Sequence, residues 1–308
     1  MIDDPLRTPV IPLAEGVEAA VEWLVRHLEP VFFAAKVPVA WLLNGFESCL
    51  LSVPPTLLVL ALGVVAWRMS SFQIAFMVSL SGVLIAMIGV WEPAMNTLSI
   101  ALTAVVFCLS MGVPLGILAA RSDRFAMALR PVLDAMQTTP SFVYLVPIVM
   151  LFGIGKVPGV IVTIIYGMPP VIRLTNLAIR QVDQEIVEAA TAFGATQPQL
   201  LFKVQLPLAL PTIMAGVNQT IMMALSMTVV SSMIGVAGLG QMVIRGLGRL
   251  DIGLAAMGGC GVVLLAVLLD RFSQAVGFAV GRKRRSNVRP LLHSRMTRIN
   301  AWFRGRTR

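Results

Sequence analysis

Few residues in this 308-residue chain have a type and spacing that could support catalysis. The sequence contains no HExxH, GxSxG or complete G-x4-GK-[ST] pattern, and Gly153-Ile-Gly-Lys156 stops short of a phosphate loop. The cysteines are far apart and form no CxxC pair, which predicts free thiols without a metal site or a disulfide framework. They are Cys49, Cys108 and Cys260, and the two histidines are His27 and His293. We therefore expect no catalytic residues, no metal and no cofactor, in a protein that is not itself an enzyme.

The most distinctive pattern is the loop Glu188–Pro207, which reads Glu-Ala-Ala, three residues, glycine, nine residues and Val-Gln-Leu-Pro. Gly194 can adopt the left-handed conformation that ends a helix and turns the chain sharply. Pro207 is expected to end a second short helix. The pattern predicts a rigid knob that could transmit motion between a soluble machine and a membrane bundle. Its predicted apolar face consists of Ile186, Val187, Ala189, Ala190 and Phe193.

The composition indicates that a lipid bilayer surrounds most of the chain. Hydrophobic residues make up 57% and charged residues 13% of the sequence, against about 25% charged residues in an average soluble domain. A spanning helix needs about 20 mostly apolar residues, and several such stretches are present. We predict an all-α, polytopic transmembrane helix bundle of about seven spans, in which Gly112 and Gly116 allow close helix packing. The candidate spans are 50–67, 73–90, 95–119, 142–155, 157–180, 212–235 and 255–280.

Two terminal regions of opposite charge flank this transmembrane domain, which we assign to residues 48–281 with a loop at 183–207. Residues 1–47 hold seven acidic and three basic residues and are predicted to form an amphipathic, interfacial segment. Residues 282–308 hold ten Lys or Arg and no acidic residue. This tail predicts a cytoplasmic location and contact with anionic membrane lipid, in preference to nucleic acid.

The distribution of basic residues predicts the orientation of the spans. Basic residues concentrate in the loops 121–130 and 180–203 and in the tail, and alternating spans place all three on the cytoplasmic side. The opposite turn, Trp91–Asn96, has no Lys or Arg, although Lys156, Arg245 and Arg249 are exceptions to the rule. Seven spans place the N-terminus in the periplasm. An eighth span through Val31–Leu43 would place the N-terminus in the cytoplasm. The sequence leaves seven and eight spans both open.

The loop resembles the EAA loop of permeases in bacterial ABC importers, whose pattern is Glu-Ala-Ala-x3-Gly-x9-Ile-x-Leu-Pro. The exact matches are Glu188, Ala189, Ala190, Gly194, Leu206 and Pro207, and Val204 replaces the usual Ile. The resemblance implies that Glu188–Gly194, including Phe193, forms a coupling helix that sits in a groove of a separate ATPase subunit. That partner subunit would bind and hydrolyse the ATP.

A longer resemblance covers most of the chain, from Phe46 to Gln274. The stretches Arg130–Pro147, Pro169–Asn176 and Gln205–Thr220 are similar to permeases for glycine betaine, proline betaine and choline. The resemblance implies an inner-membrane homodimer that works with two ATPase subunits and an extracytoplasmic substrate-binding protein. The N-terminal region is shorter, and the basic tail longer, than in some members of that family.

The translocation path is predicted from polar and aromatic residues within the spans. Intramembrane polar groups usually face a bundle interior or a cavity, and aromatic rings can contact a quaternary ammonium through cation–π interactions of about 0.5–2 kcal/mol. Simple helix packing is the alternative interpretation of the aromatic residues. Arg173 and Asp134 could form an ion pair, although nothing in the sequence requires it. The path candidates are Phe142, Tyr144, Tyr166, Asn176, Asn218 and Ser226.

Three alternatives are compatible with parts of this pattern. An ABC permease for methionine or another amino acid would share the loop but should resemble the stretches 130–147 and 169–176 less. An ion-coupled secondary transporter would need acidic residues at mid-membrane, whereas the acidic residues lie mostly near span ends. A membrane scaffold would show no substrate flux. The acidic residues considered are Glu92, Asp123, Asp134, Asp251 and Asp270.

Overall fold

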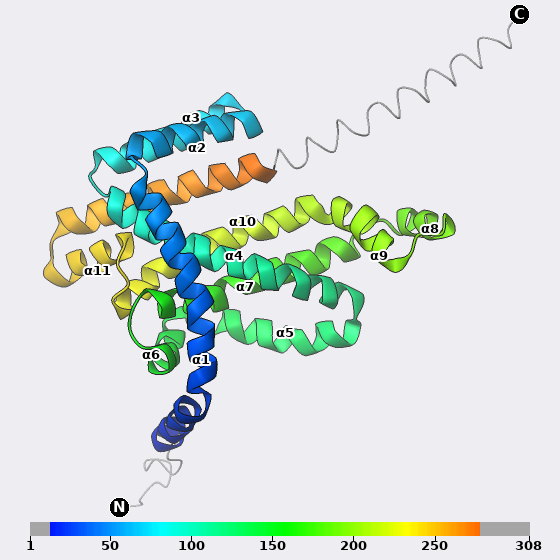
Figure 1. The fold of residues 1–308 in the computed structure, drawn as a ribbon, viewed down its shortest axis with the longest axis horizontal. Coiled ribbons are helices and arrows are strands. Elements are labelled where there is room, and N and C mark those ends of the chain that lie inside the picture. The colour runs from blue at the N-terminus through cyan, green and yellow to red at the C-terminus, as the bar shows by residue number, and fades with distance from the viewer. Residues whose placement is uncertain (1–12, 278–308) are drawn as a thin grey trace, which may run out of the picture.

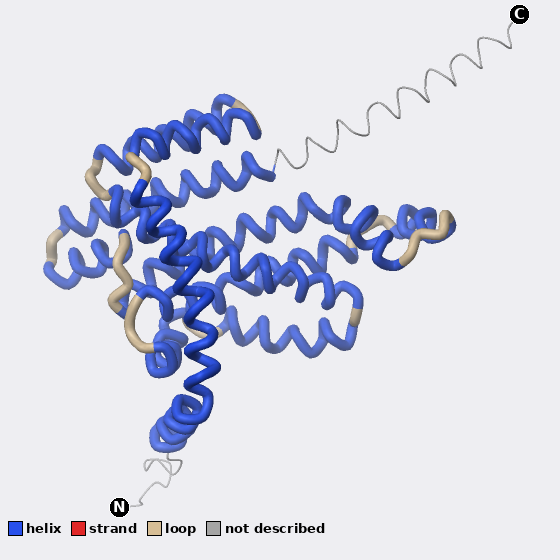
Figure 2. Tube along the Cα trace, viewed as in Figure 1, coloured by secondary structure: helices blue, strands red, loops and turns tan. Residues whose placement is uncertain are grey.

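The computed structural model describes residues 13–277, and these residues are almost entirely helical, with no β-strand in the described part (Figure 2). The predicted all-α class is therefore confirmed. The predicted basic tail at 282–308 lies outside the described residues. Eleven helices carry labels in Figure 1, and a last helix, Ile252–Gly277, is drawn in orange. The labelled helices are α1 (Leu13–Ser52), α2 (Pro55–Met69), α3 (Phe72–Met87), α4 (Trp91–Arg121), α5 (Asp123–Thr138), α6 (Leu145–Phe152), α7 (Lys156–Arg180), α8 (Gln184–Ala192), α9 (Gln197–Gln199), α10 (Leu206–Ser231) and α11 (Leu239–Arg249).

The centre of the bundle is formed by α7, which packs against both α4 and α10. Gly112 and Gly116 lie on the face of α4 that meets α7. A Cβ atom at Gly116 would lie 2.6 Å from Cβ of Thr175 and 2.9 Å from the carbonyl oxygen of Ile172. These distances are too short for any larger side chain, so the predicted close packing at the two glycines is confirmed.

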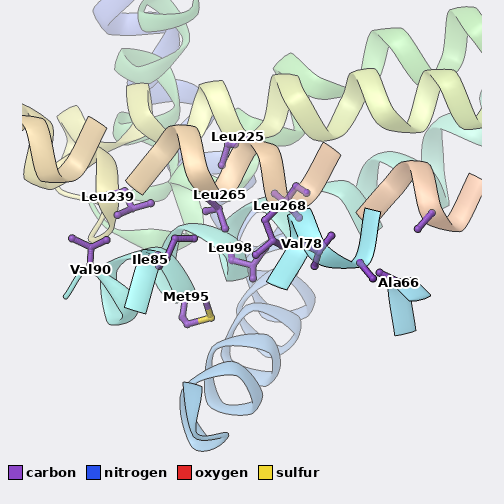
Figure 3. Close-up of a cluster of buried hydrophobic side chains, with 14 residues drawn as sticks. Ala66, Val78, Ile85, Val90, Met95, Leu98, Leu225, Leu239, Leu265 and Leu268 are labelled. Atoms are coloured by element: carbon purple, nitrogen blue, oxygen red, sulfur yellow. The ribbon is translucent and has the colours of Figure 1, made fainter. Parts of the chain in front are cut away.

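A second layer consists of α2, α3 and the last helix. Figure 3 shows buried side chains from all three meeting residues of α4 and α10. Leu265 and Leu268 of the last helix lie beside Val78 and Ile85 of α3 and Leu98 of α4 (Figure 3). This apolar cluster attaches the peripheral helices to the central ones.

The long helix α1 crosses the bundle instead of running parallel to it (Figure 1). It contacts α4, α6 and α7, and the chain bends by 105° between Pro30–Ser52 and α2. Lys156 Nζ at the start of α7 donates to Glu47 Oε1 at 2.5 Å. Phe32 and Lys36 both contact the ring of Phe152 on α6. The predicted boundary at residues 47/48 therefore falls inside one continuous helix, close to its C-terminal end.

The predicted number of seven spans is not reproduced. Four described helices are long and apolar enough to cross a membrane, or up to six if each bent helix pair is one span. The predicted span 142–155 contains a 3-10 turn and the short α6, which bends by 102° from α5. Hydropathy counts apolar residues but does not detect such bends, and the predicted span 73–90 corresponds to a shorter apolar helix, Phe72–Met87. The four helices are α4, α7, Gln197–Ile234 and Ile252–Gly277.

The ends of the central helices carry different residues. The C-termini of α4 and α7 and the N-terminus of α10 lie toward the same end of the molecule (Figure 1). Arg121, Arg180 and Lys203 mark this end, while Trp91 and Lys156 mark the other. The two basic loops that the structure describes, 121–130 and 180–203, thus lie at a common end.

Candidate coupling loop and polar face of the bundle

The helix α8 lies at the far end of the molecule, beyond the ends of α4 and α5 (Figure 1). Its N-terminus is capped by the Asp183 carboxylate, which accepts a hydrogen bond from the Glu185 backbone at 3.0 Å. Its C-terminus ends at Gly194, whose φ is +81°. The backbone N–H of Gly194 donates to Thr191 O, and that of Ala195 donates to Ala190 O, which is a Schellman motif. The glycine turn predicted from the sequence is confirmed.

The tip of α8 presents an apolar side chain to solvent. Phe193 is 93% exposed, and Ile186 is 42% exposed. Glu188 and Ala189 are also exposed, while Ala190 is half-buried. A rigidly held, exposed phenylalanine beside small side chains is typical of an anchor for a protein partner.

The base of α8 is fixed to the bundle. Val187 packs against a buried cluster that includes Ile179, Val182 and Leu201. Because this cluster draws residues from α7 and from the segment before α10, a displacement of α8 must move the ends of both helices.

Polar contacts reinforce this base. Arg180 Nη1 lies 2.7 Å from Asp123 Oδ1, and Arg180 Nη2 donates to Ala119 O at 2.8 Å. Arg121 Nη2 donates to Gln197 O at 3.4 Å. These contacts join the ends of α4, α5 and α7 to the loop that follows α8.

Pro207 does not end a helix, so this part of the sequence interpretation was wrong. A π-helical segment, Leu200–Gln205, leads directly into α10, and Pro207 lies in the first turn of α10. In a π-helix each turn holds an extra residue, and the Leu206 backbone N–H bonds to Leu201 O. The wider turn accommodates the proline ring, which would clash with the carbonyl four residues earlier in a regular helix. Consequently α8 connects to α10 through one continuous helical segment, Gln197–Ile234.

Three aromatic path candidates lie around α6. Tyr144 and Tyr166 are half-buried against a cluster that contains Leu145 and Met227. The Tyr144 hydroxyl donates to Ala135 O at 2.6 Å, which attaches the α6 region to the end of α5. Phe142 is 57% exposed. Tyr144 and Tyr166 thus meet at one cluster, and Phe142 lies in the same 3-10 turn as Tyr144.

A polar cavity of about 470 Å³ lies between α5 and α7. Asn176 lines this cavity, and its Oδ1 accepts a hydrogen bond from Arg180 Nε at 2.8 Å. Arg173 Nη2 lies 2.6 Å from Asp134 Oδ1, so the ion pair considered from the sequence is present. Arg130 also lines the cavity.

The remaining two path candidates, Asn218 and Ser226, lie on α10. Asn218 faces the last helix, where its Nδ2 donates to Asp270 Oδ1 at 3.2 Å and its Oδ1 accepts from Ser273 Oγ. Gln274 Nε2 donates to the second oxygen of Asp270 at 2.7 Å. Ser226 is exposed and donates to Met222 O of its own helix. The six predicted path residues therefore do not share one face.

The network around Asp270 was not predicted from the sequence. Asp270, Ser273 and Gln274 follow helical spacing, but nothing in the sequence indicated that Asn218 is their partner across more than fifty residues. The same holds for the ion pair of Lys156 with Glu47. No group of three or more His, Cys, Asp or Glu that could hold a metal ion occurs among residues 13–277.

The fold and the α8 knob define an integral membrane component of a transporter, in which a projecting helix connects to the central spans. The chain belongs to the family described as "Binding-protein-dependent transport system inner membrane component", whose model matches residues 112–282. It is an ABC importer permease subunit of the inner membrane by this membership.

Curated relatives align along most of the chain. It is 56% identical over 274 residues to the glycine betaine/proline betaine transport system permease protein ProW of Escherichia coli, covering 89% of this chain and 77% of the relative. It is 41% identical to the glycine betaine transport system permease protein OpuAB of Bacillus subtilis, covering 92% and 99%. A solved structure titled as inward facing conformations of the MetNI methionine ABC transporter matches with a TM-score of 0.57. It covers 62% of this chain and 95% of that chain at 20% identity, which supports the shared fold alone.

Proposed function

We propose that this permease subunit translocates quaternary ammonium compatible solutes, such as glycine betaine or proline betaine, and that choline is a further candidate. The relatives that align over most of the chain are named for glycine betaine and proline betaine. The family membership supports the transport role. The observation that supports coupling to an ATPase is the exposed Phe193 on the rigid α8 knob.

In the proposed mechanism, α8 sits in a groove of an ATPase subunit on the cytoplasmic side. The partner supplies ATP binding and hydrolysis. Closure of two ATPase subunits would pull on α8, and the continuous segment Gln197–Ile234 would carry the displacement into the membrane. Because α8 also packs against the end of α7, both central helices would move together.

The assembly that we propose is a homodimer with two ATPase subunits and an extracytoplasmic substrate-binding protein. We propose that the basic end of the molecule faces the cytoplasm, as the positive-inside bias favours. The C-terminal tail would then lie in the cytoplasm, and an odd number of spans would put the N-terminus in the periplasm. The basic tail would contact anionic lipid. The binding protein supplies the tight substrate site, so the path needs only weak contacts.

The aromatic residues Phe142, Tyr144 and Tyr166 are suited to such weak contacts. A quaternary ammonium over an aromatic face gains about 0.5–2 kcal/mol, too little to trap a solute during transport. Their position beside the break between α5 and α6 supports a place on the path.

The test is competition for uptake by the assembled complex in proteoliposomes, using radiolabelled glycine betaine. Excess unlabelled glycine betaine, proline betaine, choline and methionine are added separately with ATP inside the vesicles. The proposal expects inhibition by the quaternary amines and none by methionine. Absence of ATP-dependent glycine betaine uptake, or inhibition by methionine as strong as that by unlabelled glycine betaine, would overturn the proposed substrate class.

A further inference from the structure

The ion pair between Asp134 and Arg173 is unusually exposed for its depth in the bundle. The side chain of Asp134 is 64% exposed and that of Arg173 is 44% exposed, although Oδ1 and Nη2 lie 2.6 Å apart. An ion pair with so much accessible surface needs a polar environment around it.

The position of the pair along the two helices gives its depth. Arg173 lies about two helical turns before Arg180, the last residue of α7, which is about 10 Å at 1.5 Å per residue. Asp134 lies about 16 Å along α5 from Asp123 by the same rise. Arg173 lies within a helix, and Asp134 within a bent helix pair, that is long and apolar enough to cross a membrane. Exposed charges at this depth face water or protein and not acyl chains.

The cavity beside the pair supplies such an environment. It holds about 470 Å³, opens between α5 and α7, and combines the charged groups with Asn176 and with the apolar side chains of Leu133 and Leu177. Leu177 is 44% exposed, so the cavity continues onto an accessible surface of α7. The hydroxyl of Tyr144 bonds to the residue after Asp134, which connects this cavity to the aromatic candidates.

We propose that Asp134 and Arg173 form an exchange site for a zwitterionic solute on the cytoplasmic half of the path. The carboxylate of the solute binds the Arg173 guanidinium while its ammonium lies against the Asp134 carboxylate. Each charge of the protein exchanges one partner for another, so the site gains no net charge when the solute enters or leaves. Because exposed ion pairs contribute little stability, the pair opens at small cost. This inference rests on the proposed function and narrows its solutes to the zwitterionic ones, glycine betaine and proline betaine, because choline has no carboxylate to bind Arg173.

The first test measures glycine betaine uptake and ATP hydrolysis together in the assembled complex. We expect Arg173→Gln to lower the solute transported per ATP hydrolysed by about tenfold, since a charge-assisted contact with the carboxylate is lost. ATP hydrolysis should remain near the wild-type rate, and Arg173→Lys should recover most of the transport. The matched control is Arg124→Gln, a change on the same helix as Asp134 at an exposed residue that does not line the cavity.

A merely structural ion pair would give a different result. It predicts that Arg173→Gln lowers ATP hydrolysis and uptake together and that the reversed pair, Asp134→Arg with Arg173→Asp, restores both. That result, or unchanged transport per ATP in Arg173→Gln, overturns the exchange site while the proposed function stands. If the wild-type complex transports no glycine betaine, the proposed function fails first and the exchange site fails with it.

The second test asks whether water reaches the cavity and does not depend on the substrate. In a background with the three native cysteines replaced by alanine, Leu177→Cys should react with a charged, membrane-impermeant thiol reagent. The control is Leu60→Cys, at a 64% exposed position on α2 that lines an apolar groove, and it should remain unmodified. An unreactive Leu177→Cys would show that lipid or protein covers this face and would overturn the proposal.

Discussion

Replacing Phe193 by alanine should weaken the binding of the ATPase partner without unfolding the permease. Phe193 is 93% exposed at the tip of α8, so the free permease loses almost no packing when the ring is removed. A surface substitution of this kind changes the free energy of unfolding by about 0.5 kcal/mol or less. The effect should therefore be confined to the complex.

The expected loss follows from the area that docking would bury. Full burial of a phenylalanine side chain contributes about 1.5–3 kcal/mol. At 1.4 kcal/mol for each factor of ten, the dissociation constant should rise roughly 10- to 150-fold. The only other large apolar side chain of α8 that is exposed is Ile186, at 42%, so the ring of Phe193 is the main apolar contact that α8 offers.

The assay is binding of the purified ATPase subunit to the permease in detergent or nanodiscs, with thermal unfolding measured in parallel. Phe72→Ala is the matched control, because Phe72 is 72% exposed at the start of α3 and lies outside the knob. It should leave ATPase binding unchanged. A dissociation constant for Phe193→Ala within about twofold of wild type would refute the assignment of α8 as the docking element.

Three further substitutions test the fixed geometry. Gly194→Ala should lower ATPase-driven uptake roughly 5- to 30-fold, because alanine in the left-handed conformation costs about 1–2 kcal/mol. No atom would obstruct the added Cβ, so the backbone conformation is the only change. Normal uptake would contradict a role for the turn. Asn218→Leu leaves the carboxylate of Asp270 without one of its donors, so the melting temperature in detergent should fall by several degrees, and an unchanged value would count against the network. Glu47→Gln removes the charge that pairs with Lys156, and amide exchange in the second half of α1 should accelerate about fivefold; equal exchange would show that the apolar contacts alone hold α1.

The sequence was informative where local chemistry determines the structure. Gly194 ends α8 because a Schellman turn needs a left-handed residue, and that requirement is visible in the chain itself. Gly112 and Gly116 predicted a close helix contact because a residue without a side chain lets two helices approach. Only the structure shows that α7 is the partner.

The failures have a common physical cause, which is that tertiary context decided the outcome. Pro207 was expected to end a helix, but the preceding π-helical turn accommodates its ring. Asn218 was predicted from its polarity alone, and its hydrogen bonds to Asp270 and Ser273 on the last helix could not be read from the sequence. The course of α1 across the bundle depends on contacts with α6 and α7 that hydropathy does not report.

The source of the driving energy is the most direct test of the account. Accumulation of radiolabelled glycine betaine should be measured in proteoliposomes that contain the permease, with and without the ATPase subunit and the binding protein. The account predicts uptake that requires ATP and both partners and that persists when ionophores remove Na⁺ and H⁺ gradients. Uptake by the permease alone, driven by an ion gradient and indifferent to ATP, would contradict it.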